Sequence, residues 1–132
     1  MTMYTVVAGI DTDESRALAQ AKAISALPSA DEEVRAILLH VFGENPEGGT
    51  VEQVKSVRRA RDHLEEADVT VELEGSSGNP AETILRVAKR EGADQIILAG
   101  RKRTPTGKVL FGSVTQSVIL DSDRPVLVSP SE

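Results

Sequence analysis

The chain has 132 residues and a mass of 14.1 kDa, which predicts one domain over residues 1–132 and leaves no room for two. It contains no cysteine, so disulfides, thiolate metal sites and cysteine nucleophiles are excluded. The 21 acidic and 15 basic residues give a net charge of −6. A surface of this sign repels nucleic acid, and the aromatic residues are too few for base stacking, so we expect no nucleic-acid partner.

No apolar run is long enough to span a membrane, and no basic-then-apolar leader is present, so we expect a cytoplasmic protein with no membrane partner. Arginines outnumber lysines by ten to five. An acidic surface low in lysine is found in proteins that work at high salt, but mild acidity is also common in bacterial cytoplasmic proteins. The composition allows both interpretations.

The first part of the chain alternates strand and helix patterns. Residues 4–10 and 34–42 are apolar runs typical of strands that are buried on both faces of a parallel sheet. Between them, apolar side chains over residues 13–27 recur at helical spacing, and Pro28 ends the helix.

A second helix and an edge strand are expected next. Thr50 and Gln53 form a capping box, which predicts a helix from there to about residue 66. Residues 69–73 alternate apolar and polar side chains, as a short edge strand does, and the glycines of residues 75–78 end it.

The same alternation continues to the end of the chain. Residues 79–82 (Asn-Pro-Ala-Glu) supply an N-cap, a proline at the first helical position and a capping-box partner, which together predict a helix. Residues 95–99 and 125–128 are predicted strands, with a helix over residues 113–120 between them. Strictly alternating strands and helices indicate the α/β class, a parallel sheet with helices on both faces.

One loop carries the clearest chemical signal. Residues 100–112 contain three glycines and the cations Arg101, Lys102, Arg103 and Lys108, and lead directly into a predicted helix. Ser113 and Gln116 predict a capping box there, and the helix N-terminus favours an anion such as phosphate. The alternative is a solvated basic turn in which Ser113 only caps its helix. The loop matches neither the Walker A motif nor the dinucleotide-binding glycine motif.

Several motifs along the chain occur together in one known family. The chain carries Gly9 before Asp11-Thr12-Asp13-Glu14-Ser15, then His40-Val41, Gly78-Asn79-Pro80, Gly100, Gly112-Ser113-Val114-Thr115 and Arg124-Pro125-Val126-Leu127-Val128. Over nearly its whole length the sequence therefore resembles the universal stress protein family. The resemblance implies a three-layer αβα sandwich, Rossmann-like and similar to the adenine nucleotide alpha hydrolases, with strand order 3-2-1-4-5.

The resemblance also implies a function. It suggests a nucleotide-binding stress-response or signalling module that binds ATP or AMP and forms a homodimer through its C-terminal strand. The residues that it implies for nucleotide binding are Gly9, Asp11, Val41, Gly100, Arg101, Gly112, Ser113, Val114 and Thr115, and Arg103 of the basic loop is a further candidate. The sequence shows no candidate catalytic base or nucleophile. We therefore expect that the protein is not an enzyme and that it hydrolyses ATP slowly at most.

The basic loop departs from the motif of the ATP-binding members, Gly-x2-Gly-x9-Gly-Ser/Thr. Arg103 stands where the second glycine belongs, and eight residues separate it from Gly112. Its guanidinium can replace the missing glycine as a phosphate clamp, or its bulk can block the approach of phosphate. If it blocks the site, the chain is an interaction or structural protein, or it binds another anion through the basic loop.

Acidic residues near the expected phosphate path raise the question of a metal. Asp11, Asp13 and Glu14 would oppose a phosphate unless a cation such as Mg²⁺ or Mn²⁺ bridged them. Asp11 can alternatively start the first helix. The two histidines, His40 and His63, lie on different elements, which gives no local signature of a zinc site or a catalytic triad. His40 is interpreted as a hydrogen-bonded histidine at a strand end.

Overall fold

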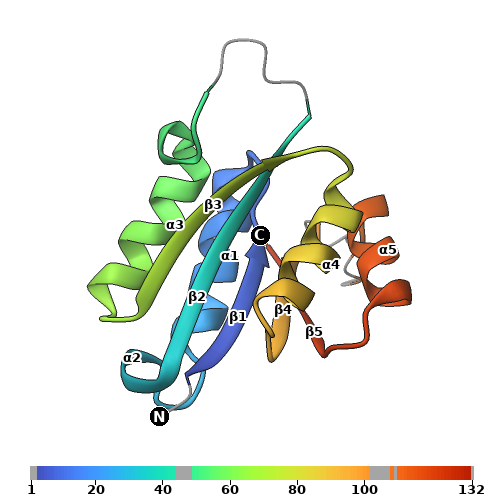
Figure 1. Ribbon diagram of the computed structural model, residues 1–132. Coiled ribbons are helices and arrows are strands. Elements are labelled where there is room, and N and C mark those ends of the chain that lie inside the picture. Colours follow the sequence, from blue (N-terminus) through green and yellow to red (C-terminus); the bar gives the residue numbers. More distant parts are fainter. Residues whose placement is uncertain (1–2, 44–48, 102–107, 109, 132) are drawn as a thin grey trace.

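The computed structural model describes residues 3–43, 49–101, 108 and 110–131. Five parallel strands form one sheet in the order β3-β2-β1-β4-β5, which confirms the predicted order (Figure 1). The strands are β1 (Tyr4–Gly9), β2 (Val34–Phe42), β3 (Thr70–Ser77), β4 (Gln95–Ala99) and β5 (Val126–Ser129).

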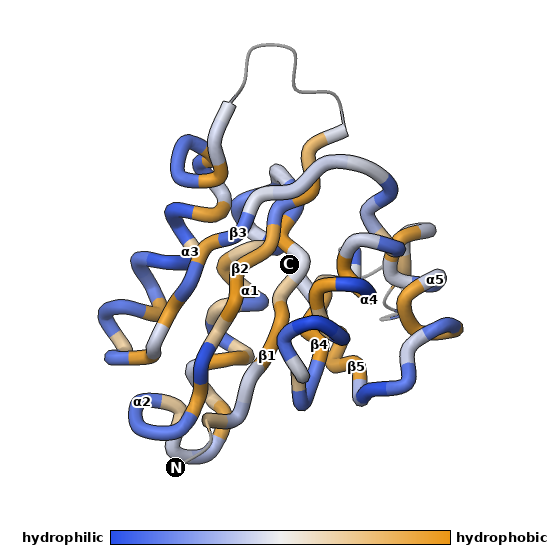
Figure 2. Tube along the Cα trace, viewed as in Figure 1, coloured by the Kyte–Doolittle hydropathy of each residue, from blue (hydrophilic) through white to orange (hydrophobic). Residues whose placement is uncertain are grey.

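Helices cover both faces of the sheet, as predicted, with α1 and α3 on one face and α4 and α5 on the other (Figure 1). The helical segments are α1 (Glu14–Ser25), α2 (Ala30–Glu33), the 3₁₀ turn η1 (Val51–Gln53), α3 (Lys55–Glu66), α4 (Pro80–Arg90) and α5 (Ser113–Asp121). The three central strands are buried on both sides. This explains why hydrophobic residues are concentrated along β1, β2 and β4 (Figure 2). Helix α3, by contrast, is largely hydrophilic.

The two neighbours of β1 do not pair with it to the same point. Pairing between β1 and β2 continues to Gly9↔Leu39, whereas pairing between β1 and β4 ends one residue earlier, at Ala8↔Ile97. The helix after β1 covers one face and the helix after β4 covers the other. A crevice at the carboxyl ends of β1 and β4 is therefore expected, because the strand order reverses there.

Two predicted boundaries differ from the structure. The capping box of Thr50 and Gln53 is present, but it caps the start of the short 3₁₀ turn η1 and not of a long helix. Val54 then adopts an extended backbone and α3 starts after it. Strand β3 is longer than predicted because Gly75 does not break it: this residue pairs with His40, and the first glycine with a positive φ in this segment is Gly78, at 119°.

The predicted start of the last helix at residue 113 is confirmed, but the capping box predicted there and the number of helices were wrong. The N-cap of α5 is Gly112, so Ser113 is its first helical residue and caps nothing with its side chain. Gln116 Nε2 donates instead to the Phe111 carbonyl at 3.0 Å. Helix α2 was not predicted, since its four residues are too few to show a helical period.

Candidate functional site

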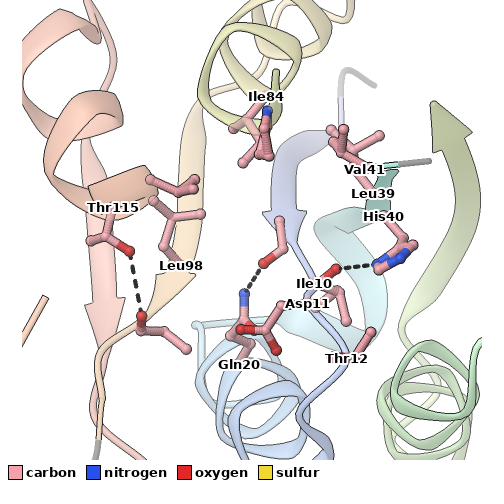
Figure 3. A pocket seen from close by; sticks show the side chains of 15 residues that line it. Ile10, Asp11, Thr12, Gln20, Leu39, His40, Val41, Ile84, Leu98 and Thr115 are labelled. Carbon is pink, nitrogen blue, oxygen red and sulfur yellow. Dashed lines mark hydrogen bonds between the residues drawn. The ribbon is translucent and has the colours of Figure 1, made fainter. Parts of the chain in front are cut away.

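A cavity of about 340 Å³ lies at the carboxyl edge of the sheet (Figure 3). It is lined by Gly9, Ile10, Asp11, Thr12, Gln20, Leu39, His40, Val41, Gly43, Pro80, Ile84, Leu98, Ala99, Val114 and Thr115. Its size is within the usual range for small-molecule sites, and its walls are mainly apolar with a few polar groups. The cavity therefore has the position and character of a ligand site of a parallel α/β sheet.

Gly9 allows the wall of this cavity to pack closely at the end of β1. A Cβ atom at this position would lie 2.7 Å from Ile84 Cδ1 and 3.1 Å from Leu98 Cδ2. Both of those side chains line the cavity. A larger residue would have to displace them, so the glycine keeps the wall between β1, β4 and α4 tightly packed.

The buried amide of Gln20 joins the two strands that diverge at the cavity. Its Nε2 donates to the Gly9 carbonyl at 2.8 Å (Figure 3). The same nitrogen donates to the Ile97 carbonyl at 3.1 Å, and the residue is 1% exposed. These carbonyls belong to β1 and β4 at the point where pairing between the two strands ends, at Ala8↔Ile97. The sequence analysis did not identify Gln20, although a glutamine among the buried residues Ala17, Ala21 and Ile24 was a detectable signal.

His40 fixes the opposite wall of the cavity. Its Nδ1 lies 2.7 Å from the Ile10 carbonyl, and its ring contacts Phe42 edge to face. A carbonyl only accepts, so Nδ1 carries the proton. This arrangement agrees with the interpretation of His40 as a hydrogen-bonded histidine at a strand end, and it ties β2 to the loop after β1.

Asp11 is exposed at the mouth of the cavity and pairs with an arginine. Its Oδ2 accepts from Arg16 Nε at 2.8 Å, and its Oδ1 accepts from the Asp13 backbone N–H at 2.8 Å. The N-cap of α1 is Asp13, whose Oδ1 accepts from the Arg16 N–H at 2.9 Å. Asp11 therefore does not cap the first helix, which corrects that alternative.

Hydrogen bonds keep the Asp13 carboxylate charged. The Arg16 backbone N–H, and then the Ser15 hydroxyl, lower the pKa of Asp13 from its usual value, because both donate to the ionised form. Glu14 contacts Lys55 and Arg59, at 3.8 and 3.6 Å. In the described part of the chain, no group of three or more histidine, aspartate or glutamate side chains is arranged to hold a metal ion.

A smaller cavity of about 160 Å³ adjoins the first one. It is lined by Asp11, Arg16, Ala99, Arg101, Gly112, Ser113, Val114 and Thr115, of which Asp11, Ala99, Val114 and Thr115 also line the larger cavity. It lies against the first turn of α5, whose first intrahelical bond runs from the Gln116 N–H to the Gly112 carbonyl. The N–H groups of that turn have no carbonyl partner within the helix, so this end of α5 favours an anion.

Arg101 lies against this helix start. Its backbone N–H donates to the Leu110 carbonyl at 2.7 Å, which closes the base of the basic loop. A Cβ atom built on Gly112 would lie 3.5 Å from Arg101 Nη2. The guanidinium group therefore lies close to the N-cap of α5, where it adds positive charge to that of the helix terminus.

The structure brings together most of the residues proposed from the sequence. Gly9, Asp11, Val41, Val114 and Thr115 line the larger cavity, and Arg101, Gly112 and Ser113 line the smaller one. Gly100 lines neither: its N–H donates to the Ser129 carbonyl at 2.8 Å, and its carbonyl accepts from the Ser131 hydroxyl at 3.0 Å. Arg103 lies outside the described residues.

The fold and the two adjoining cavities define a Rossmann-like α/β protein with a candidate ligand site where the strand order reverses. Residues 3–130 match the universal stress protein family, and the chain belongs to that family. The match confirms the resemblance seen in the sequence.

A curated relative and several solved structures are similar to this chain. Universal stress protein MJ0577 of Methanocaldococcus jannaschii is 45% identical over 51 residues, which cover 39% of this chain and 32% of that protein. The aligned segment thus spans about a third of the relative. A universal stress protein structure from Archaeoglobus fulgidus superposes with a TM-score of 0.77 at 25% identity, covering 98% of this chain and 99% of that one.

Two further structures share the fold and are described with a ligand. A universal stress protein in complex with cAMP has a TM-score of 0.75 at 23% identity, with both chains covered completely (100% each). One from Archaeoglobus fulgidus in complex with dAMP has a TM-score of 0.71 at 18% identity, with 98% and 99% of the two chains covered. Among the described residues of the present chain, no helix combines the length and hydrophobicity needed to span a membrane.

Proposed function

We propose that this chain binds an adenine nucleotide, AMP or ATP, and works as a single-domain stress-response or signalling module in the cytoplasm. The observation that carries the proposal is the pair of adjoining cavities at the carboxyl edge of the sheet, one mainly apolar and one cationic. A nucleotide has the same two parts, a flat base and an anionic phosphate. The cAMP and dAMP complexes of proteins with this fold support the choice of an adenine nucleotide.

The proposed binding mode assigns each part of the nucleotide to one cavity. The base lies in the larger cavity between Gly9 and Val41, and the ribose lies near Asp11. The phosphates lie in the smaller cavity, near Arg101 and the first turn of α5, where Ser113 to Thr115 present their N–H groups. The proposal includes Mg²⁺ or Mn²⁺ bound with the phosphates, whose charge favours a divalent cation.

The proposed role is binding without catalysis. Three polar side chains that line the larger cavity are used in structural contacts: Gln20 and His40 bond backbone carbonyls, and Asp11 pairs with Arg16. None of these contacts activates a nucleophile or positions a general base for hydrolysis. We propose that the protein signals whether a nucleotide is bound, and that it does not need to hydrolyse the nucleotide to do so.

Titration calorimetry with AMP, ATP and inorganic phosphate tests this function. We expect the purified protein to bind the nucleotides, and Ala99→Leu to weaken that binding because Ala99 lines both cavities. Ala23→Leu is the matched control, since Ala23 is half-buried on α1 and lines neither of the two. Absence of nucleotide binding at millimolar concentration would contradict the proposal and favour an interaction protein without nucleotide.

Variants of Arg103 separate the two interpretations of the altered motif. If its guanidinium holds phosphate, Arg103→Ala weakens ATP binding by about 1.5 to 3 kcal/mol, as expected for a charge-assisted contact. If its bulk blocks phosphate, the wild type does not bind and Arg103→Gly gains affinity. The same titrations measure both variants.

A further inference from the structure

Two arginines from different elements line the smaller cavity. Arg16 comes from the first turn of α1, and Arg101 follows β4. They are 85 residues apart in the sequence, as their numbers show, yet both contribute to a cavity of about 160 Å³. Only Arg101 belongs to the glycine-rich loop from which phosphate binding was predicted.

Arg16 is held in place by its contacts, which do not use all of its N–H donors. Its Nε donates to Asp11 Oδ2 at 2.8 Å, and its Nη1 lies 3.9 Å from Asp13 Oδ2. A guanidinium group has five N–H donors in one plane, so the bond to Asp11 leaves donors on both terminal nitrogens. The side chain is 30% exposed, which leaves these donors accessible from the cavity side.

The contact between Arg16 and Asp11 also reduces the repulsion between the Asp11 carboxylate and a bound phosphate. The Asp11 carboxylate lines both cavities, and an unpaired carboxylate would repel a phosphate in the adjoining space. Pairing with Arg16 neutralises this charge and fixes the plane of the guanidinium. Arginine recognises phosphate through two parallel N–H donors, which requires such a fixed orientation.

We propose that Arg16 is a phosphate-contacting residue of the nucleotide site, oriented by Asp11 and acting together with Arg101. This inference rests on the proposed function and adds a source of specificity to it. Arg16 makes the site discriminate a nucleotide from its nucleoside, because only the nucleotide carries the anion that the two guanidinium groups contact.

The test is a double-mutant cycle measured with adenosine and AMP by titration calorimetry. The four proteins are the wild type, Asp11→Asn, Arg16→Met and the double variant. We expect Arg16→Met to weaken AMP binding about tenfold and to change adenosine binding by less than about twofold. We expect a loss of AMP affinity of similar size when Arg16→Met is made in the Asp11→Asn background, because the amide oxygen there still accepts from Arg16 Nε and keeps its orientation, while no carboxylate is left to neutralise.

Two controls accompany the cycle. Arg58→Met removes one positive charge from an exposed position on α3 that lines neither cavity, and is expected to leave AMP affinity unchanged. Arg16→Lys keeps the charge without the planar fork, so we expect part of the AMP affinity to be lost. If Arg16→Met does not fold, Arg16→Lys carries the same comparison.

The outcomes separate this inference from the proposed function. Equal losses for AMP and adenosine, or an Arg16 effect that disappears in the Asp11→Asn background, overturn the phosphate contact alone. In those cases Arg16 only shapes the loop or neutralises Asp11, and the protein still binds nucleotide. A wild type that binds neither adenosine nor AMP overturns the proposed function, and this inference with it.

Discussion

Individual residues at the end of β1 decide the shape of the site. Gly9 allows Ile84 and Leu98 to pack against the strand, and Gln20 holds the ends of β1 and β4 in place as the strands diverge. The sequence pointed to Gly9 through a family motif. It did not point to Gln20, because the partners of a buried amide are distant in the chain and become known only in the fold.

Removing the amide of Gln20 should destabilise the fold. Gln20→Leu leaves the Gly9 and Ile97 carbonyls without their side-chain donor, and we expect the free energy of unfolding to fall by about 1 to 3 kcal/mol. Urea denaturation measures the change. Gln116→Leu is the control: this glutamine also donates to a backbone carbonyl, but at an exposed site, so we expect a change within about 0.5 kcal/mol. Equal effects of the two substitutions would contradict this role.

At the scale of elements, a network of charges ties β2, β3 and the end of α4 together. Arg35 of β2 bonds Glu72 of β3, and its Nη2 lies 2.7 Å from Glu91 Oε1 at the C-cap of α4. Arg90 in turn bonds Glu91 and Glu74. The network joins the edge strand β3 to β2 and to the end of α4.

This network should make the stability of the protein sensitive to acid. The hydrogen bonds from Arg35 lower the pKa of Glu72 and of Glu91 below the usual 4.5, and Arg90 contributes at Glu91. The folded state therefore binds fewer protons than the unfolded state near this pH. The stabilisation is complete well above pH 4.5 and is lost as the pH falls through the lowered folded-state values.

Arg35→Met tests this pH dependence. Without Arg35 both carboxyl groups lose the main cause of their lowered pKa, so we expect a shallower loss of stability between about pH 6 and 3 than in the wild type. Urea midpoints across that range give the slope. Arg58→Met, which removes an exposed arginine outside the network, should retain the wild-type slope. A wild-type slope in Arg35→Met would show that the network does not act in this way.

At the scale of the whole molecule, β5 forms one edge of the sheet. All four residues of this strand are half-buried, and its outer side has no strand partner in the described chain. Among the described residues, four of the five large exposed hydrophobic side chains lie on α5 or just before it: Leu110, Phe111, Ile119 and Leu120. Unpaired strand edges and exposed apolar side chains are both commonly buried when protein chains associate.

We therefore predict a homodimer formed through β5. Sedimentation at micromolar protein concentration measures the mass, and it should be done both at moderate salt and at the salt that best preserves the fold. The second condition matters because the net charge of −6 opposes association when it is poorly screened. A monomer under both conditions would contradict the prediction.

The sequence by itself determined the class of fold and the edge of the sheet where the candidate site lies, and its family resemblance implied the strand order. Buried parallel strands and amphipathic helices leave local periodic patterns, and the family motifs lie directly after those strands. Only the tertiary structure decided which polar groups are available there. Gly100, predicted to hold phosphate, has its N–H bonded to β5, whereas Arg16, not predicted, lines the smaller cavity beside Arg101. These assignments depend on contacts between distant residues, which no local pattern encodes.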